Sequence, residues 1–142
     1  MKRIISIITL ISILALLLTG CGKINVDKSV KALKAKGMRD AATYTTDEDL
    51  EFASELYNYE IEYWNGDFTV QIDGYTSLVA DLDFTKKAEF ITFSSKREAK
   101  AYTELYLENR DEYSDLKIAR KGRVIVITNL DLVIKTLGVD FE

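Results

Sequence analysis

Apolar residues recur with helical spacing in four stretches of the chain, near residues 26–36, 46–57, 96–109 and 130–137. In such a stretch, residues three or four positions apart share one face, which can pack against a core. Each stretch follows a residue that can cap a helix N-terminus, namely Asn25 or Asp27, Thr45 or Thr46, Ser95, and Asn129. We therefore expect four helices, the first and the last each ending at a glycine.

Between these stretches, apolar and polar residues alternate, which is the period of a strand with one buried face. Strands are therefore predicted over residues 40–45, 78–84, 88–93, 116–120 and 123–129. Turns are predicted at Asp73-Gly74, Lys86-Lys87 and Lys121-Gly122. The run over residues 124–127 is apolar on both faces, which is typical of a central strand.

The segment over residues 59–72 allows two interpretations. Apolar residues alternate with glutamates before Asn65-Gly66, and a second alternating run begins at Phe68. Asn-Gly between two alternating runs favours a hairpin, since both residues of a type I′ turn have positive φ. We therefore predict a hairpin over residues 59–72, and the alternative is that the second helix continues to about Trp64.

Helices that alternate with antiparallel hairpins are typical of the α+β class. The predicted architecture is a two-layer sandwich of a mainly antiparallel sheet with helices packed on one face. A single α+β domain is expected to span residues 26–142, which is within the usual size range for one core.

A separate apolar stretch at the start of the chain has the three parts of a secretory signal. Residues 1–3 carry two positive charges, residues 4–18 are almost entirely apolar, and Thr19-Gly20 precedes Cys21, the single cysteine. A membrane-spanning helix needs about 20 apolar residues, so this stretch is too short to cross a bilayer. The alternative is a slightly short membrane anchor with an incidental cysteine.

The motif Leu18-Thr19-Gly20-Cys21 resembles the lipobox of bacterial lipoproteins, in which a leucine and two small residues precede the cysteine that is lipidated. The resemblance implies that residues 1–20 are a cleaved signal peptide and that Cys21 carries a diacylglyceryl group. Residues 21–25 would then form the lipidated anchor and a short linker. The partner implied is the cell membrane, on its extracytoplasmic face, because two acyl chains hold a protein stably on a bilayer.

The charge of the chain is unevenly distributed. Its 19 basic and 23 acidic residues give a net charge of −4, which argues against nucleic acid as a partner. A lysine-rich segment nevertheless follows Cys21, with Lys23, Lys28, Lys31, Lys34 and Lys36. We interpret these lysines as candidate membrane-surface contacts, since cations near a lipid anchor can approach anionic headgroups. The alternative is that they form the solvated face of the first helix.

The composition excludes several kinds of catalytic site. The chain contains no histidine, which excludes schemes that need an imidazole base. No cofactor and no metal site is predicted, since the acidic run at residues 47–49 lacks the spacing of a calcium loop. Asp81 and Asp83 are candidates for the carboxylate pair that glycoside hydrolysis requires. Acids at i and i+2 are also common on the solvent face of a strand, so we predict that the protein is not an enzyme.

A basic cluster of Arg120, Lys121 and Arg123 lies at the predicted last hairpin. If the turn has two residues, Arg120 and Arg123 lie opposite each other and repel. An anion such as a phosphate-rich envelope polymer or a lipid headgroup would relieve the repulsion, so the three residues are candidate anion contacts. The alternative is a turn that is kept soluble by its charges.

Aromatic residues are dense in the middle of the chain, where they can pack in a core or contact a partner. They are Tyr57, Tyr59, Tyr63, Trp64, Phe68 and Tyr75. The strand interpretation places Tyr59, Ile61 and Tyr63 in the core and leaves Trp64 exposed beside the turn. Exposed rings would suit sugars or a protein.

Three functions are compatible with these features. The favoured function is a membrane-anchored surface lipoprotein with a small non-catalytic interaction domain, whose partner is a protein or an envelope polymer. The alternative is a small-ligand-binding or sensor-accessory lipoprotein, which requires a concave pocket lined by the aromatic residues. The third is a carboxylate-dependent envelope hydrolase, which would depend on Asp81 and Asp83.

Overall fold

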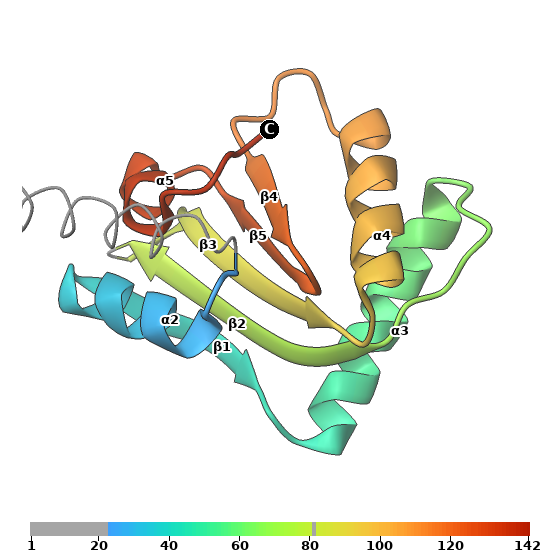
Figure 1. Cartoon of the computed structure of the whole chain (residues 1–142), viewed down its shortest axis with the longest axis horizontal. Coiled ribbons are helices and arrows are strands. Elements are labelled where there is room, and N and C mark those ends of the chain that lie inside the picture. The colour runs from blue at the N-terminus through green and yellow to red at the C-terminus, as the bar shows by residue number, and fades with distance from the viewer. Residues whose placement is uncertain (1–22, 81) are drawn as a thin grey trace, which may run out of the picture.

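Five antiparallel strands form one sheet in the order β1-β2-β3-β5-β4. The structure, a computed structural model, describes residues 23–80 and 82–142. The strands in this part are β1 (Met38–Tyr44), β2 (Ile72–Ala80), β3 (Asp83–Phe93), β4 (Lys117–Lys121) and β5 (Val124–Thr128) (Figure 1). The predicted α+β class and the antiparallel pairing are confirmed.

Four helices pack against this sheet in the described part of the chain. They are α2 (Val26–Ala35), α3 (Asp47–Tyr63), α4 (Lys96–Asn109) and α5 (Asp131–Leu137). The predicted N-caps are confirmed for three of them, because Asn25, Thr46 and Ser95 each accept a hydrogen bond from the backbone three residues further on. Local polar residues therefore define where these helices begin.

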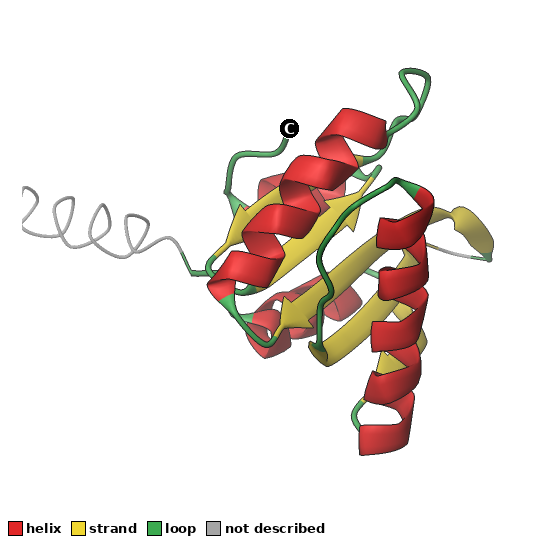
Figure 2. Ribbon diagram, turned by 90° about the vertical axis from the view of Figure 1, so that its right-hand side faces the viewer, coloured by secondary structure: helices red, strands yellow, loops and turns green. Residues whose placement is uncertain are grey.

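The helices cover both faces of the sheet. Ile125 and Ile127 of β5 pack with α3 and α4, whereas Val126 packs with α2 and α5. Consecutive residues of a strand point to opposite faces, so the two pairs of helices lie on opposite sides, with α3 and α4 in front of the sheet in Figure 2. The sequence predicted helices on one face, because an apolar stripe on a helix does not specify which face it covers.

The two faces have separate cores. The core below α3 and α4 includes Ile61, Phe93, Tyr102 and Ile125. The core below α2 and α5 includes Leu33, Met38, Leu78, Phe90 and Val133. This arrangement explains why β5 is apolar on both faces, and its predicted position inside the sheet is confirmed.

The predicted hairpin over residues 59–72 is wrong, and the alternative of a longer helix is right. Helix α3 continues to Tyr63 with Trp64 as its C-cap, and the next residue, Asn65, has a φ of 58°. The Asn65 N–H donates to Glu62 O at 2.9 Å and the Gly66 N–H to Ile61 O at 2.8 Å, a Schellman pair of bonds. Asn-Gly supplies the left-handed conformation that a helix end also needs, so this motif alone does not distinguish the two structures.

The chain from α3 to β2 is held by side chains of α3. The Asn58 side chain donates to Val70 O at 3.0 Å and accepts from Val70 N at 2.7 Å. About one helical turn before Asn58, Ser54 Oγ accepts from Ile72 N at 2.9 Å. These bonds satisfy backbone groups that the predicted hairpin would have paired with another strand.

Two predicted turns lie inside strands. Asp73-Gly74 is part of β2, where the pairing with β3 shifts register between Ile72 and Gly74. Lys86-Lys87 is part of β3, and the chain instead turns between Ala80 and Asp83. Glycine is common in both bulges and turns. Gly74 therefore marks an irregularity of the backbone, as expected, but the irregularity is a bulge within β2 and not a turn between strands.

The last part of the chain forms the β4–β5 hairpin, α5 and a tail beside β4. The hairpin turns at Gly122, as predicted, which has a φ of 63°. Leu130, not Asn129, is the N-cap of α5, and Asn129 instead accepts from Lys87 N at 3.1 Å. Ile118 and Glu142 exchange both backbone hydrogen bonds, at 2.9 and 2.8 Å, along the free side of β4.

Candidate binding site

A cavity of about 370 Å³ opens on the face of the sheet that α3 and α4 cover. We call it the tyrosine pocket, because five of its lining residues are tyrosines. It is lined by Tyr44, Ala53, Leu56, Tyr57, Glu60, Tyr75, Lys87, Glu89, Tyr102, Tyr106, Leu116 and Ile127. Four strands and two helices contribute side chains, so most of the fold is needed to form it.

Ring contacts fix the tyrosines of the pocket in place. Tyr44 of β1 stacks on Tyr75 of β2, with ring centroids 5.0 Å apart. Tyr57 of α3 meets Tyr102 of α4 edge to face at 5.2 Å, and Tyr106 lies 6.3 Å from Tyr102. Contacts of this geometry are favourable between aromatic rings, so two walls of the pocket are pre-formed.

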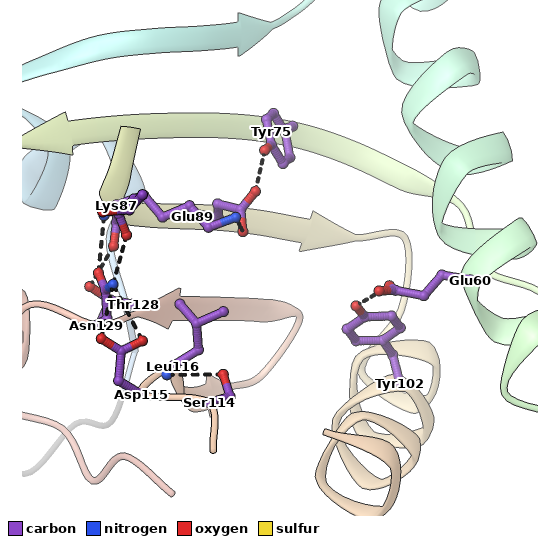
Figure 3. Close-up of polar contacts among 11 residues, drawn as sticks. Glu60, Tyr75, Lys87, Glu89, Tyr102, Ser114, Asp115, Leu116, Thr128 and Asn129 are labelled. Atoms are coloured by element: carbon purple, nitrogen blue, oxygen red, sulfur yellow. Dashed lines mark hydrogen bonds and ion pairs between the residues drawn. The ribbon is translucent and has the colours of Figure 1, made fainter. Parts of the chain in front are cut away.

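Glu60 links the two helices across the pocket. The Tyr102 hydroxyl donates a 2.6 Å hydrogen bond to Glu60 Oε2 (Figure 3). Burial raises the pKa of the Glu60 carboxyl, and the negative charge of Glu89 raises it further. The hydrogen bond from Tyr102 and the positive charge of Lys87 lower this pKa, but they do not cancel the effect of burial.

Glu89 is the second carboxylate of the pocket and has two partners. The Tyr75 hydroxyl donates to Glu89 Oε1 at 2.6 Å, and Lys87 Nζ lies 3.1 Å from Glu89 Oε2 (Figure 3). Lys87 and Glu89 are two residues apart on β3 and therefore share a face of the sheet. The lysine places a positive charge directly beside this carboxylate.

Four phenol groups of the pocket are held in their neutral form. Burial is the main cause that raises the pKa of Tyr57, Tyr75, Tyr102 and Tyr106. For Tyr75 and Tyr102 the hydrogen bond to a carboxylate raises the pKa further, since it favours the protonated phenol. The pocket therefore combines aromatic surface with two carboxylates and one lysine.

Sequence reasoning identified two of these tyrosines but not the carboxylates. Tyr57 and Tyr75 belong to the predicted aromatic group, whereas Glu60 is one of the glutamates that alternate with apolar residues in the predicted strand. On a helix, Glu60 lies three residues after Tyr57 and shares its face. A helical interpretation of this segment could therefore have found Glu60.

The structure also corrects the exposure predicted for three aromatic residues. Tyr59 is 71% exposed and Tyr63 is 76% exposed, while Ile61 between them is buried. Trp64, predicted to be exposed, packs on the core with its ring 6.0 Å from that of Tyr106. Each difference follows from replacing the strand period of two by the helical period of 3.6.

The basic cluster at the last hairpin does not have its predicted geometry. Lys121 pairs with Val124 and Arg120 with Ile125, so Arg120 and Arg123 are not opposed. Arg123 instead forms an ion pair with Asp73 at 3.0 Å and donates to Ser94 O at 3.3 Å. The premise of mutual repulsion is therefore wrong, and an anion contact at these residues stays a prediction.

The lysines predicted to contact a membrane lie in or beside α2. Lys23, Lys28 and Lys31 are exposed. Lys34 forms an ion pair with Asp40, and Lys36 donates to Thr136 Oγ1 at 2.8 Å. Membrane contact at these five positions stays a prediction.

Three other predicted features concern residues outside the described part or at its edges. The signal peptide 1–20, Cys21 and Asp81 lie outside the described residues. Because β2 ends at Ala80 and β3 begins at Asp83, the single strand predicted over 78–84 is wrong. Across residues 23–80 and 82–142, no helix has the length and apolar character that crossing a membrane requires.

Comparison of the chain with protein-family models, with curated proteins and with solved structures found no match. A function must therefore be argued from the residues themselves. The tyrosine pocket is the feature that brings aromatic surface and charged groups from distant parts of the sequence together, so the functional argument begins there.

Proposed function

We propose that this protein is a lipid-anchored, extracytoplasmic binding protein that takes a small ligand in the tyrosine pocket. The anchor is supported by the resemblance of residues 18–21 to a lipobox. The binding role is supported by the pocket itself. Ligand sites are typically concave, about 300–1,000 Å³ in volume and mostly apolar, with a few placed polar groups, and the 370 Å³ tyrosine pocket has these properties.

A non-catalytic role fits the chemical groups that line the pocket. Burial keeps the tyrosines protonated and therefore weakly nucleophilic. Glu89 is already paired with Lys87 and Tyr75, and the chain has no histidine to act as a base. These groups are suited to holding a ligand in a defined orientation.

The linker between anchor and domain would keep the pocket close to the membrane. Helix α2 begins at Val26, and Asn25 caps it. Since a residue spans at most about 3.5 Å, residues 21–25 would hold the domain within a short distance of the lipid. The exposed Lys28 and Lys31 would then be available to anionic headgroups.

Ligand titration followed by amide chemical shifts tests the pocket as the binding site. We expect a library of small aromatic and amphiphilic compounds to shift resonances of pocket residues. Leu56→Trp should weaken binding, because Leu56 lines the pocket and is 51% exposed. Phe52→Trp is the matched control, since Phe52 is 52% exposed one turn earlier on α3 and lies outside the lining. Shifts that scatter over the surface, or equal effects of both variants, would contradict the proposal.

Replacement of the cysteine tests the anchor. We expect the chain to label with palmitate and to fractionate with membranes, and Cys21→Ser to lose the label and appear in the soluble fraction. Label that persists in Cys21→Ser would contradict lipidation at this residue. Membrane retention of unlabelled Cys21→Ser at low salt and its release at high salt would assign retention to the lysines of α2.

A second candidate function, a protein-interaction domain, is favoured by the outer face of α3. Phe52, Leu56, Tyr59 and Tyr63 are spaced by four, three and four residues and form one stripe on the helix. Their exposed fractions are 52, 51, 71 and 76%. An exposed stripe of four large apolar side chains on one helix is typical of a docking surface.

The charges beside the stripe indicate the kind of partner. Helix α3 contains seven acidic residues and no basic residue. Glu48, Glu51, Glu55 and Glu62 are exposed alongside the stripe. A second copy docking by the same face would oppose acid to acid, and anionic lipid would be repelled. The partner proposed is therefore an amphipathic helix with basic flanks.

A defined peptide tests this second function. A helical peptide with leucines on one face and lysines beside them should bind the chain, and the same peptide with glutamates should not. The double variant Tyr59→Ser/Tyr63→Ser should weaken binding, while Tyr113→Ser, at an 87% exposed position outside α3, should not. Equal binding by both variants would exclude the stripe as the docking surface.

A further inference from the structure

Three charged side chains line the tyrosine pocket, and their positions leave one negative charge uncompensated. Lys87 Nζ is 3.1 Å from Glu89 Oε2, so these two charges offset each other. Within residues 23–80 and 82–142, no lysine or arginine forms an ion pair with Glu60. The polar partner of Glu60 is the neutral Tyr102 hydroxyl, so the pocket has a net charge of about −1 when Glu60 is ionised.

The hydrogen-bonding groups at the two carboxylates of the pocket mostly accept. The Tyr75 and Tyr102 hydroxyls already donate to Glu89 and Glu60. Carboxylates accept at both oxygens, and a phenol oxygen accepts as well as donates. A ligand group that only donates, such as an ammonium, would therefore find acceptors at Glu60 and Glu89, whereas a carboxylate or phosphate group would be repelled by them and would compete with Glu89 for Lys87.

The aromatic rings favour positive charge as well. The face of a tyrosine ring carries negative electrostatic potential, which attracts a cation within about 6 Å of the ring centre. Tyr44, Tyr57, Tyr75, Tyr102 and Tyr106 all contribute to the lining. Leu56 and Leu116 add aliphatic surface at the same pocket, which a hydrocarbon group on the ligand can cover.

Building on the proposed function, we infer that the ligand of the tyrosine pocket is an organic cation: a protonated amine or quaternary ammonium joined to an apolar group. Glu60 pairs with the positive charge, the tyrosine rings surround it, and the leucines contact the apolar group. The raised pKa of Glu60 agrees with this assignment, since a buried carboxylate that no ion pair contacts ionises less readily, even with Lys87 acting on it from a greater distance. A cation beside Glu60 would offset the unfavourable free energy of ionising this buried carboxyl group.

Three probes of similar size and different charge test the inference. Phenethylamine is cationic at neutral pH, 2-phenylethanol is neutral, and 3-phenylpropionate is anionic. Their affinities for the purified full chain would be measured by calorimetry and by chemical-shift titration at one ionic strength. We expect the amine to bind about tenfold or more tighter than the alcohol, because a charged hydrogen bond is stronger than a neutral one, and the carboxylate to bind weakest.

Substitutions of the charged residues assign the effect to Glu60. Glu60→Gln should reduce amine affinity by about tenfold and leave alcohol affinity unchanged, since the amide keeps an acceptor for Tyr102 but lacks the charge. Glu62→Gln is the matched control, because Glu62 is exposed on the same helix and outside the pocket lining. Lys87→Gln should act in the opposite direction and raise amine affinity, because it leaves Glu89 unneutralised.

The outcomes separate this inference from the proposed function. Equal affinity for the amine and the alcohol, or no effect of Glu60→Gln on the amine, overturns the cation class while leaving the pocket as a binding site. Failure of the amine to bind at millimolar concentration also overturns it. The proposed function itself fails if the wider compound library moves no pocket resonance.

Discussion

The fold shifts the pKa values of two carboxyl groups, Glu60 and Glu98, in opposite directions. The pKa of Glu60 is raised, chiefly by burial. Burial acts the same way on Glu98, but its hydrogen bonds with the Ser94 and Ser95 hydroxyls and with the Gln71 backbone together lower its pKa. Glu98 therefore stabilises the fold when ionised, and Glu60 when protonated.

This difference predicts the pH dependence of a Glu60 variant. A raised carboxyl pKa contributes stability below the unfolded value of 4.5, and that contribution is lost as pH rises through the folded pKa. At neutral pH, Glu60→Gln should therefore unfold at a higher urea concentration than the parent protein. Below pH 4.5 the two proteins should unfold at the same urea concentration. The groups facing Glu60 are Tyr102 of α4 and Lys87 and Glu89 of β3.

Glu62→Gln is the control for that measurement. Glu62 is exposed, and exposed substitutions usually change stability by less than about 0.5 kcal/mol. If Glu60→Gln is less stable than the parent at neutral pH, the hydrogen bond from Tyr102 outweighs the burial of the charge.

Residues that act locally were the most predictable from sequence. The capping pair Ser95 and Glu98 is three residues apart, and the structure confirms that Ser95 Oγ accepts from Glu98 N. The carboxylates of the pocket were not predictable in this way. Glu60 and Tyr102 are 42 residues apart, and only the packing of α3 beside α4 brings them together.

Among the elements, the end of α3 is the clearest case in which a local motif allowed two structures. Tyr59 and Tyr63 alternate with glutamates as strand residues would, yet both lie on the outer face of a helix. The chain after the helix is held by hydrogen bonds in which Asn58 and Ser54 accept from the backbone N–H groups of Val70 and Ile72. No local pattern encodes those contacts, so the period of two was misleading.

Gly66 gives a test of this helix end. A Cβ atom there would lie 2.6 Å from Ile61 Cγ2 and 2.9 Å from Leu105 Cδ2. Gly66→Ala should therefore lower the free energy of unfolding by about 1–3 kcal/mol, the usual cost of overpacking. Denaturant titration measures this change.

Gly74→Ala is the matched comparison, because its Cβ would meet Thr92 at an ordinary 3.6 Å. It should change stability much less than Gly66→Ala. Similar losses in both variants would mean that glycine flexibility, and not the close approach at Gly66, determines the effect.

At the scale of the whole molecule, the sequence analysis predicted the class of fold correctly and placed the helices on one face of the sheet instead of two. Apolar and polar periods identify helices and strands separately, and their order indicates α+β. The second helical layer depends on which sheet face α2 and α5 cover. The apolar residues 124–127 indicate a second helical layer, because a strand with apolar side chains on both faces needs helices packed on both faces of the sheet.

Charge is also organised over the whole molecule. The lysine-rich α2 and the acidic α3 lie toward opposite ends of the view in Figure 1. For a domain anchored beside α2, the acidic helix and its apolar stripe would face away from an anionic bilayer. The two ends of the domain would thus meet different surroundings.

The backbone pairing of Ile118 with Glu142 affects how neighbouring copies meet. A protein confined to a membrane encounters its own copies at high local concentration, where an open strand edge invites intermolecular sheet extension and aggregation. The paired tail occupies part of the free edge of β4. Glu142→Pro removes the N–H that donates to Ile118 O, and we expect it to accelerate aggregation in concentrated solution. Glu142→Ala keeps the donor and should aggregate at the parent rate, and equal aggregation of the two variants would mean that this pairing does not protect the edge of β4.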